Sequence, residues 1–154
     1  MNLVSFDEAR VLIAQWRSAG HRVVLANGAF DLLHVGHVRY LEGARALGDR
    51  LLVAVNSDAS VRAAKGPPRP LISQAERAEL VQALRCVDAV IVFDEPDVRH
   101  LIRSLQPEVH AKGTDYTVDT VPEREEVERY GGTVAIAGDP KNHSTSAVLS
   151  KLNR

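Results

Sequence analysis

The sequence predicts an α/β fold of the doubly wound kind, with a parallel sheet of about five strands and helices on both of its faces. Short apolar runs rich in β-branched residues alternate along the chain with helical stretches. The run at residues 51–55 is apolar without alternation, which is typical of a strand whose two faces are covered by helices. Two capping-box patterns, Ser5 with Glu8 and Ser73 with Glu76, mark helix starts between such runs.

The expected strands and helices alternate after a first helix that begins at Ser5 and is ended by Gly20. The strands are expected at residues 22–26, 51–56, 89–93, 109–111 and 133–137, and the helices between and after them at 35–46, 73–85, 97–105, 122–130 and 144–152. Right-handed crossovers place the loops after the strands at the carboxyl edge of the sheet, where such folds bind ligands. The expected ligand-binding loops are therefore 27–35, 56–72 and 111–121.

Length and composition indicate one domain over residues 1–154, with an N-terminal helix in residues 1–20 and a core in residues 22–152. No run approaches the ~20 apolar residues of a membrane helix, and the acidic start does not suit a signal peptide, so we expect a cytoplasmic protein without membrane contact. The formal net charge of -1 gives no general attraction to nucleic acid. Cys86 is the only cysteine, which excludes an intrachain disulfide.

The loop after the first strand has the features of an anion site. A helix N-terminus offers unpaired N–H groups and partial positive charge, and Gly28 and Gly36 would let a ligand approach the backbone. His34 and His37, three residues apart, could donate hydrogen bonds to one polyphosphate. Two alternatives stay open. In one, the histidines are loop or helix-capping residues and the glycines only make a turn; in the other, the histidines bind zinc, although no third ligand is evident nearby.

The residues of this loop, Gly28-x-Phe30-Asp31-x-x-His34-x-Gly36-His37, resemble the signature of the cytidylyltransferase-like nucleotidyltransferase superfamily, whose fold is Rossmann-like. The resemblance implies that His34 and His37, the histidines of the HxGH element, hold a triphosphate and stabilise the charge that develops during transfer. It also implies nucleotide contacts in the turn itself, at Asn27, Gly28, Ala29, Phe30 and Gly36. The dinucleotide-binding glycine fingerprint is absent from this turn.

Three further segments resemble phosphate-binding parts of the same superfamily. Ser144, Thr145 and Ser146 stand at an Ile-Ser-Thr-Thr element that binds the β and γ phosphates, with His143 in place of the isoleucine. Lys65 stands at a catalytic lysine that reaches the α-phosphate, and Arg77 at an arginine that contacts phosphate. Without the resemblance, Ser144 reads as a helix cap, and Lys65 and Arg77 read as solvated surface charges.

A narrower resemblance covers residues 23–149 and is to the D-glycero-β-D-manno-heptose 1-phosphate adenylyltransferases. It is carried by the segments 37–41, 44–49, 53–58 and 112–116. It implies transfer of AMP from ATP to a sugar 1-phosphate, which gives an ADP-sugar and pyrophosphate, with Mg²⁺ brought by ATP and no metal ligand from the protein. Many such domains are fused to a sugar kinase, so a separate sugar kinase is expected here, and a homodimer is expected by analogy.

Polar residues near the strand ends are the candidates for the acceptor pocket: Asp31, Asn56, Asp58, Lys112 and Asp115. Asp31 could instead cap the next helix, and Asn56 and Asp58, with Ser57, could form a polar strand-end turn. Other members of the superfamily share the HxGH chemistry, so a glycerol-3-phosphate cytidylyltransferase or a pantetheine-phosphate adenylyltransferase is an alternative. A non-catalytic nucleotide-binding module is the alternative from another class.

Overall fold

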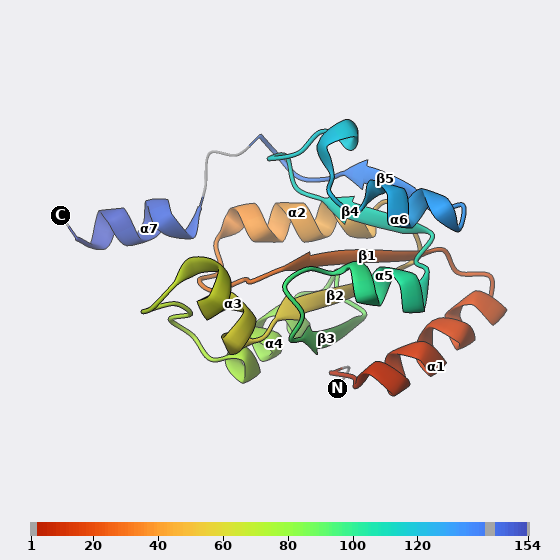
Figure 1. The fold of residues 1–154 in the computed structure, drawn as a ribbon, viewed down its shortest axis with the longest axis horizontal. Helices are drawn as coiled ribbons and strands as arrows, with labels where there is room; N and C mark the ends of the chain where they lie inside the picture. The colour runs from red at the N-terminus through yellow and green to blue at the C-terminus, as the bar shows by residue number, and fades with distance from the viewer. Residues whose placement is uncertain (1–2, 141–143, 154) are drawn as a thin grey trace.

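A parallel sheet lies at the centre of the computed structural model, which describes residues 3–140 and 144–153 (Figure 1). In this part of the chain the sheet has five strands in the order β3-β2-β1-β4-β5, and every pairing is parallel. The strands are β1 Val23–Gly28, β2 Arg50–Asn56, β3 Ala89–Phe93, β4 Val109–Lys112 and β5 Thr133–Ile136. The predicted parallel α/β fold is confirmed, with each strand within two residues of its expected bounds.

Helices cover both faces of this sheet. They are α1 Phe6–Ser18, α2 Val35–Arg45, α3 Asp58–Lys65, α4 Gln74–Gln82, α5 Arg99–Leu105, α6 Arg124–Arg129 and α7 Thr145–Leu152, with a short 3-10 turn η1 at Val118–Thr120. One core joins α1, α5 and α6 to the sheet, and a second core joins α2 and α4 to its other face. In Figure 1, α7 projects from the body of the molecule.

Strand β1 shows why the central strands are apolar without alternation. Val23 and Leu25 point into the first core, whereas Val24 and Ala26 point into the second. Their exposed fractions are all 1% or less. Burial of a side chain such as Leu25 contributes roughly 1.5–3 kcal/mol to the stability of the fold. Apolar side chains on both faces of β1 therefore stabilise its position at the centre of the sheet.

The first helix begins with the predicted capping box. The Oγ of Ser5 accepts from the backbone N–H of Glu8 at 3.2 Å, and the Glu8 carboxylate accepts from the backbone N–H of Ser5 at 2.7 Å. Ser73 likewise accepts from the N–H of Glu76 and begins α4. Local hydrogen-bonding signals were therefore sufficient to predict both helix starts.

The expectation of one continuous loop over residues 56–72 is wrong, because α3 occupies its first half. Ser57 caps this helix by accepting from the N–H of Ser60 at 3.2 Å, and Asp58 places a negative charge in the first turn. The helix ends at Gly66, whose φ of +74° favours glycine. Lys65 is consequently the last residue of a helix and not a loop residue.

None of the helices formed by the described residues is long and apolar enough to cross a membrane. His143, which stands at the isoleucine position of the family element, lies outside the described residues.

Candidate active site

A pocket of about 290 Å³ opens at the carboxyl edge of the sheet, where α2, α3 and α7 approach the turns that follow β4 and β5. Eight of the residues proposed from the sequence line it: His34, Gly36, His37, Lys65, Asp115, Ser144, Thr145 and Ser146. The structure therefore brings together residues that are up to 112 positions apart along the chain, and it does so at the edge that the fold class predicts.

The two histidines begin α2 and cap it together. The Nδ1 of His34 accepts from the N–H of Gly36 at 3.1 Å, and the Nδ1 of His37 accepts from the N–H of His34 at 3.3 Å. A nitrogen that accepts a hydrogen bond carries no proton, so each neutral imidazole carries its proton on Nε2. Nε2–H is the group that can donate to a phosphate oxygen, and the helix cap is what fixes this tautomer.

The histidines can therefore cap the helix and point Nε2–H donors at a ligand in one and the same geometry. The His34 and His37 rings stack with their centroids 3.9 Å apart and an interplanar angle of 27°. Both side chains line the pocket, so their common direction places two ring N–H donors beside the N-terminus of one helix. This combination of donors and helix dipole suits an anion with several oxygens.

The turn before this helix supports the site from behind. Phe30 is 3% exposed, has a φ of +51°, and contacts the edge of the His37 ring with a centroid distance of 5.3 Å. A Cβ on Gly28 would come within 3.1 Å of the Phe30 ring, so Gly28 makes room for an aromatic ring. The residues that line the pocket do not include Asn27, Gly28, Ala29 or Phe30. The space that Gly28 leaves open is therefore occupied by the Phe30 ring in this structure.

The structure places Arg77, which the resemblance assigns to a phosphate contact, inside the protein and away from the pocket lining. Its side chain is 0% exposed, and its guanidinium donates to the carbonyl of Ile72 at 2.9 Å, to the carbonyl of Ala29, and to Oδ1 of Asp58 at 2.9 Å. Arg77 therefore ties the turn after β1 to α3 and α4 from inside the protein. Asp58, proposed for the acceptor, uses its carboxylate in the same contact and does not line the pocket.

Asp31 also serves the interior. Its side chain accepts from Nε of Arg69 at 2.6 Å, from the N–H of Leu71 at 2.8 Å and from the N–H of Ile72 at 3.0 Å. Burial by itself would raise the pKa of Asp31, but the donors from Ile72, Arg69 and Leu71 outweigh it and lower the pKa below its usual value. Asp31 is not among the residues that line the pocket, and the cap of α2 is His34 and not Asp31.

Lys112 and Asn56 also lie away from the pocket. The Lys112 side chain is 11% exposed, lies 4.8 Å from the centre of the Tyr116 ring, and has its Nζ 3.9 Å from Oε2 of Glu123. Burial lowers the pKa of the Lys112 ammonium, and the charge of Glu123 partly offsets this. Asn56 donates to Oγ of Ser60 at 3.3 Å and so helps to begin α3.

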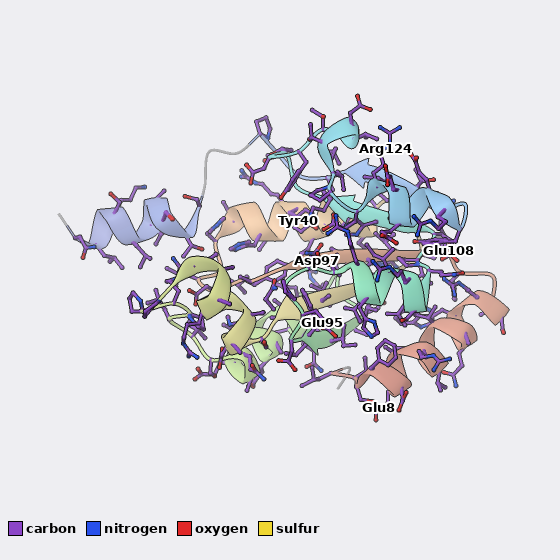
Figure 2. The ribbon with its side chains drawn as sticks, viewed as in Figure 1. Glu8, Tyr40, Glu95, Asp97, Glu108 and Arg124 are labelled. Carbon is purple, nitrogen blue, oxygen red and sulfur yellow. The ribbon has the colours of Figure 1, made fainter. Side chains whose placement is uncertain are left out.

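The sequence interpretation missed several residues that line the pocket, namely Arg39, Tyr40, Arg69, Gly113, Thr114 and residues 137–140. Arg39 forms an ion pair of 3.0 Å with Asp139. Tyr40, which is labelled beside α2 in Figure 2, donates to the carbonyl of Ala111 at 2.7 Å. A signal for these two existed, since Arg39 and Tyr40 follow Gly36 by three and four residues and share its helix face. Arg69 and Asp139 had no such local signal.

A metal site is not evident in the part of the chain that the structure describes. There, no group of three or more histidine, cysteine, aspartate or glutamate residues could hold a metal ion. Zinc binding by His34 and His37 would need further ligands, because structural zinc sites take four. The geometry described above therefore favours anion binding by the histidine pair.

The fold and the pocket together define an α/β protein with a pocket, lined by the histidine pair, at the carboxyl edge of a parallel sheet. Residues 25–150 match the family model described as cytidylyltransferase-like, and the chain belongs to this family. The predicted class, a nucleotidyltransferase enzyme, is confirmed by that membership.

The chain is similar to proteins of known name over most of its length. The chain is 51% identical over 148 residues to a protein named "Bifunctional protein HldE" from Geobacter sulfurreducens, with 96% of this chain and 30% of that protein covered. It is 32% identical to the lipopolysaccharide core biosynthesis protein from Thermoplasma volcanium, whose crystal structure superposes with a TM-score of 0.63 over 76% of this chain and 94% of that one. Pantothenate synthetase from Thermus thermophilus, at 18% identity and a TM-score of 0.63 over 94% of this chain and 63% of that one, shares the fold.

Proposed function

We propose that this domain transfers AMP from ATP to D-glycero-β-D-manno-heptose 1-phosphate, giving ADP-heptose and pyrophosphate. The observation that carries the proposal is the stacked pair of His34 and His37, which lines one pocket together with Lys65 and the start of α7. The 51% identity to HldE and the similarity to a lipopolysaccharide core biosynthesis protein support the sugar as acceptor. The chain spans 30% of the length of this HldE protein, so the proposal concerns the activity of the matching part and not that of the whole protein.

The mechanism needs positioning and charge stabilisation and no protein nucleophile. An oxygen of the sugar phosphate attacks the α-phosphorus of ATP, and the bond from that phosphorus to the β-bridging oxygen breaks in line with it. The electron pair leaves with pyrophosphate. Nε2–H of His34 and His37 donates to the phosphate oxygens, and the Lys65 ammonium offsets the charge that develops at the α-phosphate.

The start of α7 supplies the second anion site. Ser144 caps this helix by accepting from the N–H of Ala147 at 3.0 Å, and Thr145 donates to the carbonyl of Leu32 at 3.3 Å in the turn that leads to the histidines. The N–H groups of the first helical turn, that of Thr145 included, and the hydroxyls of Ser144 and Ser146 would hold the β and γ phosphates. The Thr145 contact would keep α7 in register with the histidine pair.

Mg²⁺ is proposed to enter with ATP, bound to its phosphates, and would supply positive charge to the leaving pyrophosphate. It retains several waters and needs few protein ligands, and the pocket offers the carboxylates of Asp115 and Asp139 for such waters. The remaining proposals are cytoplasmic localisation, a homodimer, and a sugar kinase that supplies the acceptor. The word "bifunctional" in the name of the HldE relative agrees with a second activity linked to this one.

The proposal is tested by incubating the protein with ATP, Mg²⁺ and heptose 1-phosphate and measuring pyrophosphate release and ADP-sugar by mass spectrometry. Parallel reactions replace ATP by CTP and the sugar by glycerol 3-phosphate or phosphopantetheine. We expect ATP and the sugar phosphate to give product. Product only with CTP and glycerol 3-phosphate would instead identify a glycerol-3-phosphate cytidylyltransferase. Nucleotide binding without product from any acceptor would identify a non-catalytic module.

A further inference from the structure

Arg69 has an unusual position among the pocket residues. It lies in the loop after α3 and lines the pocket, yet its side chain is only 15% exposed. Within the described residues its Nη2 is buried and has no hydrogen-bond partner. A buried guanidinium stays charged, and an N–H without an acceptor is costly to a fold, so this donor calls for a ligand.

Asp31 fixes the other side of this guanidinium. Its Oδ2 accepts from Nε of Arg69 at 2.6 Å, and the backbone N–H groups of Leu71 and Ile72 hold the same carboxylate. Asp31 is 1% exposed, so water does not compete for these contacts. The arginine is therefore held in one orientation by a residue that itself cannot move, which is the arrangement expected of a preorganised binding group.

The place of Arg69 in the fold indicates which anion it meets. Arg69 and Lys65 follow β2, whereas Ser144 to Ser146 follow β5, and β2 and β5 lie on opposite sides of β1 in the sheet order. The histidines come from the turn after β1, between these two groups. In-line transfer places the attacking and leaving oxygens on opposite sides of the α-phosphorus. With pyrophosphate at the start of α7, the attacking phosphate lies on the side of Arg69.

We propose that Arg69 binds the phosphate of the acceptor and that Asp31 is the positioning residue that orients it. This inference rests on the proposed transfer to a phosphorylated acceptor and adds the residue that recognises the acceptor phosphate. Arginine suits this role because its planar fork can direct two N–H groups at one phosphate while Nε–H stays with Asp31, a geometry that the single ammonium of a lysine does not have.

The test compares Arg69→Ala, Arg69→Lys and Asp31→Asn with the control Arg62→Ala, an exposed arginine of α3 that does not line the pocket. We expect Arg69→Ala to raise the KM for the sugar phosphate roughly 10-fold or more, as for a lost hydrogen bond to a charged group, while the KM for ATP stays within about twofold. Arg69→Lys should also have a raised KM for the sugar phosphate, because one ammonium cannot keep the contact with Asp31 and also present a planar fork to the phosphate. Asp31→Asn should raise the same KM less.

A second measurement keeps the inference separate from the proposed function. Calorimetry would follow inorganic phosphate binding to protein saturated with a nonhydrolysable ATP analogue, in the wild type, Arg69→Ala and Arg62→Ala. Loss of phosphate binding in Arg69→Ala alone supports the phosphate site even if no sugar phosphate is turned over. If the wild type is active but Arg69→Ala keeps both its acceptor KM and its phosphate binding, the inference is overturned. A raised KM for ATP alone would also overturn it.

Discussion

The imidazole of His37 accepts a hydrogen bond from the backbone of His34, and the two rings stack 3.9 Å apart at the start of α2. The same two side chains therefore cap the N-terminus of a helix and present ring N–H donors to a pocket. Because the bonds to Nδ1 fix the tautomer, the structural role and the proposed catalytic role depend on one geometry.

Replacing His37 with glutamine should separate these roles. Glutamine at the third helical position can still accept from the N–H of His34, so His37→Gln should keep its thermal stability, whereas His37→Ala should lose about 1 kcal/mol from the incomplete cap. Both variants should reduce turnover by about 10²-fold, because a charge-stabilising donor is removed or displaced. Thermal unfolding and steady-state assays would check this, with the exposed His100→Ala as control. Near-normal turnover of His37→Gln would contradict the catalytic role.

Lys65→Ala should lower kcat and leave the KM for ATP nearly unchanged, because the ammonium is proposed to act on charge that develops during transfer. Lys65 is the last residue of α3, so its removal should not disturb the fold. Steady-state rates over a range of ATP concentrations would separate the two parameters. A raised KM for ATP at constant kcat would make Lys65 a residue that binds ATP in the ground state.

Arg77→Met should destabilise the protein by about 3 kcal/mol or more, because it leaves two partly buried carbonyls and the Asp58 carboxylate without their donor. Urea unfolding would measure the loss. The exposed Arg62→Met on α3 is the matched control and should change stability little. If Arg77→Met were instead as stable as wild type but bound ATP more weakly, the result would support the phosphate contact that the resemblance assigns to Arg77.

The stability contributed by Asp31 should depend on pH. Its folded pKa lies below the ordinary value of 3.8, so this contribution is present above that pH and is lost as the pH falls through the folded pKa. The difference in unfolding free energy between wild type and Asp31→Asn should therefore be constant near neutrality and shrink below about pH 4. Chemical denaturation from pH 7 to pH 3 would measure it. A difference that stayed constant throughout would argue against the ionised contact with Arg69.

The buried pair of Lys112 and Glu123 should show strong coupling. Lys112→Met alone removes the ammonium and leaves a carboxylate that is only 5% exposed, so it should be markedly destabilising. The double variant Lys112→Met, Glu123→Gln should recover part of that loss, because no buried charge is left unpaired. A double-mutant cycle by urea unfolding would give the coupling. Additive effects of the two changes would mean that their charges act independently.

Much of the fold was evident from the sequence, because its signals are local. The β-branched runs predicted the strands, and Ser5 and Ser73 predicted two helix starts through hydrogen bonds that span three residues. Ser57 carries the same local signal and caps α3, within the segment that is expected from the sequence to be a loop. The HxGH element could also be recognised from the sequence, since His34, Gly36 and His37 lie within one helical turn.

The sequence by itself determined the layered α/β fold, the family and the turn that carries the histidine pair, because each depends on short spacings. Only the tertiary structure decided which charged residues face the pocket. Arg77 and Asp31 are drawn inward by partners 19 and 38 positions away, while Arg69 and Asp139 are brought to the pocket. The physical reason is that a charged side chain takes the direction in which its hydrogen bonds are satisfied, and those partners are assembled only when distant segments pack together.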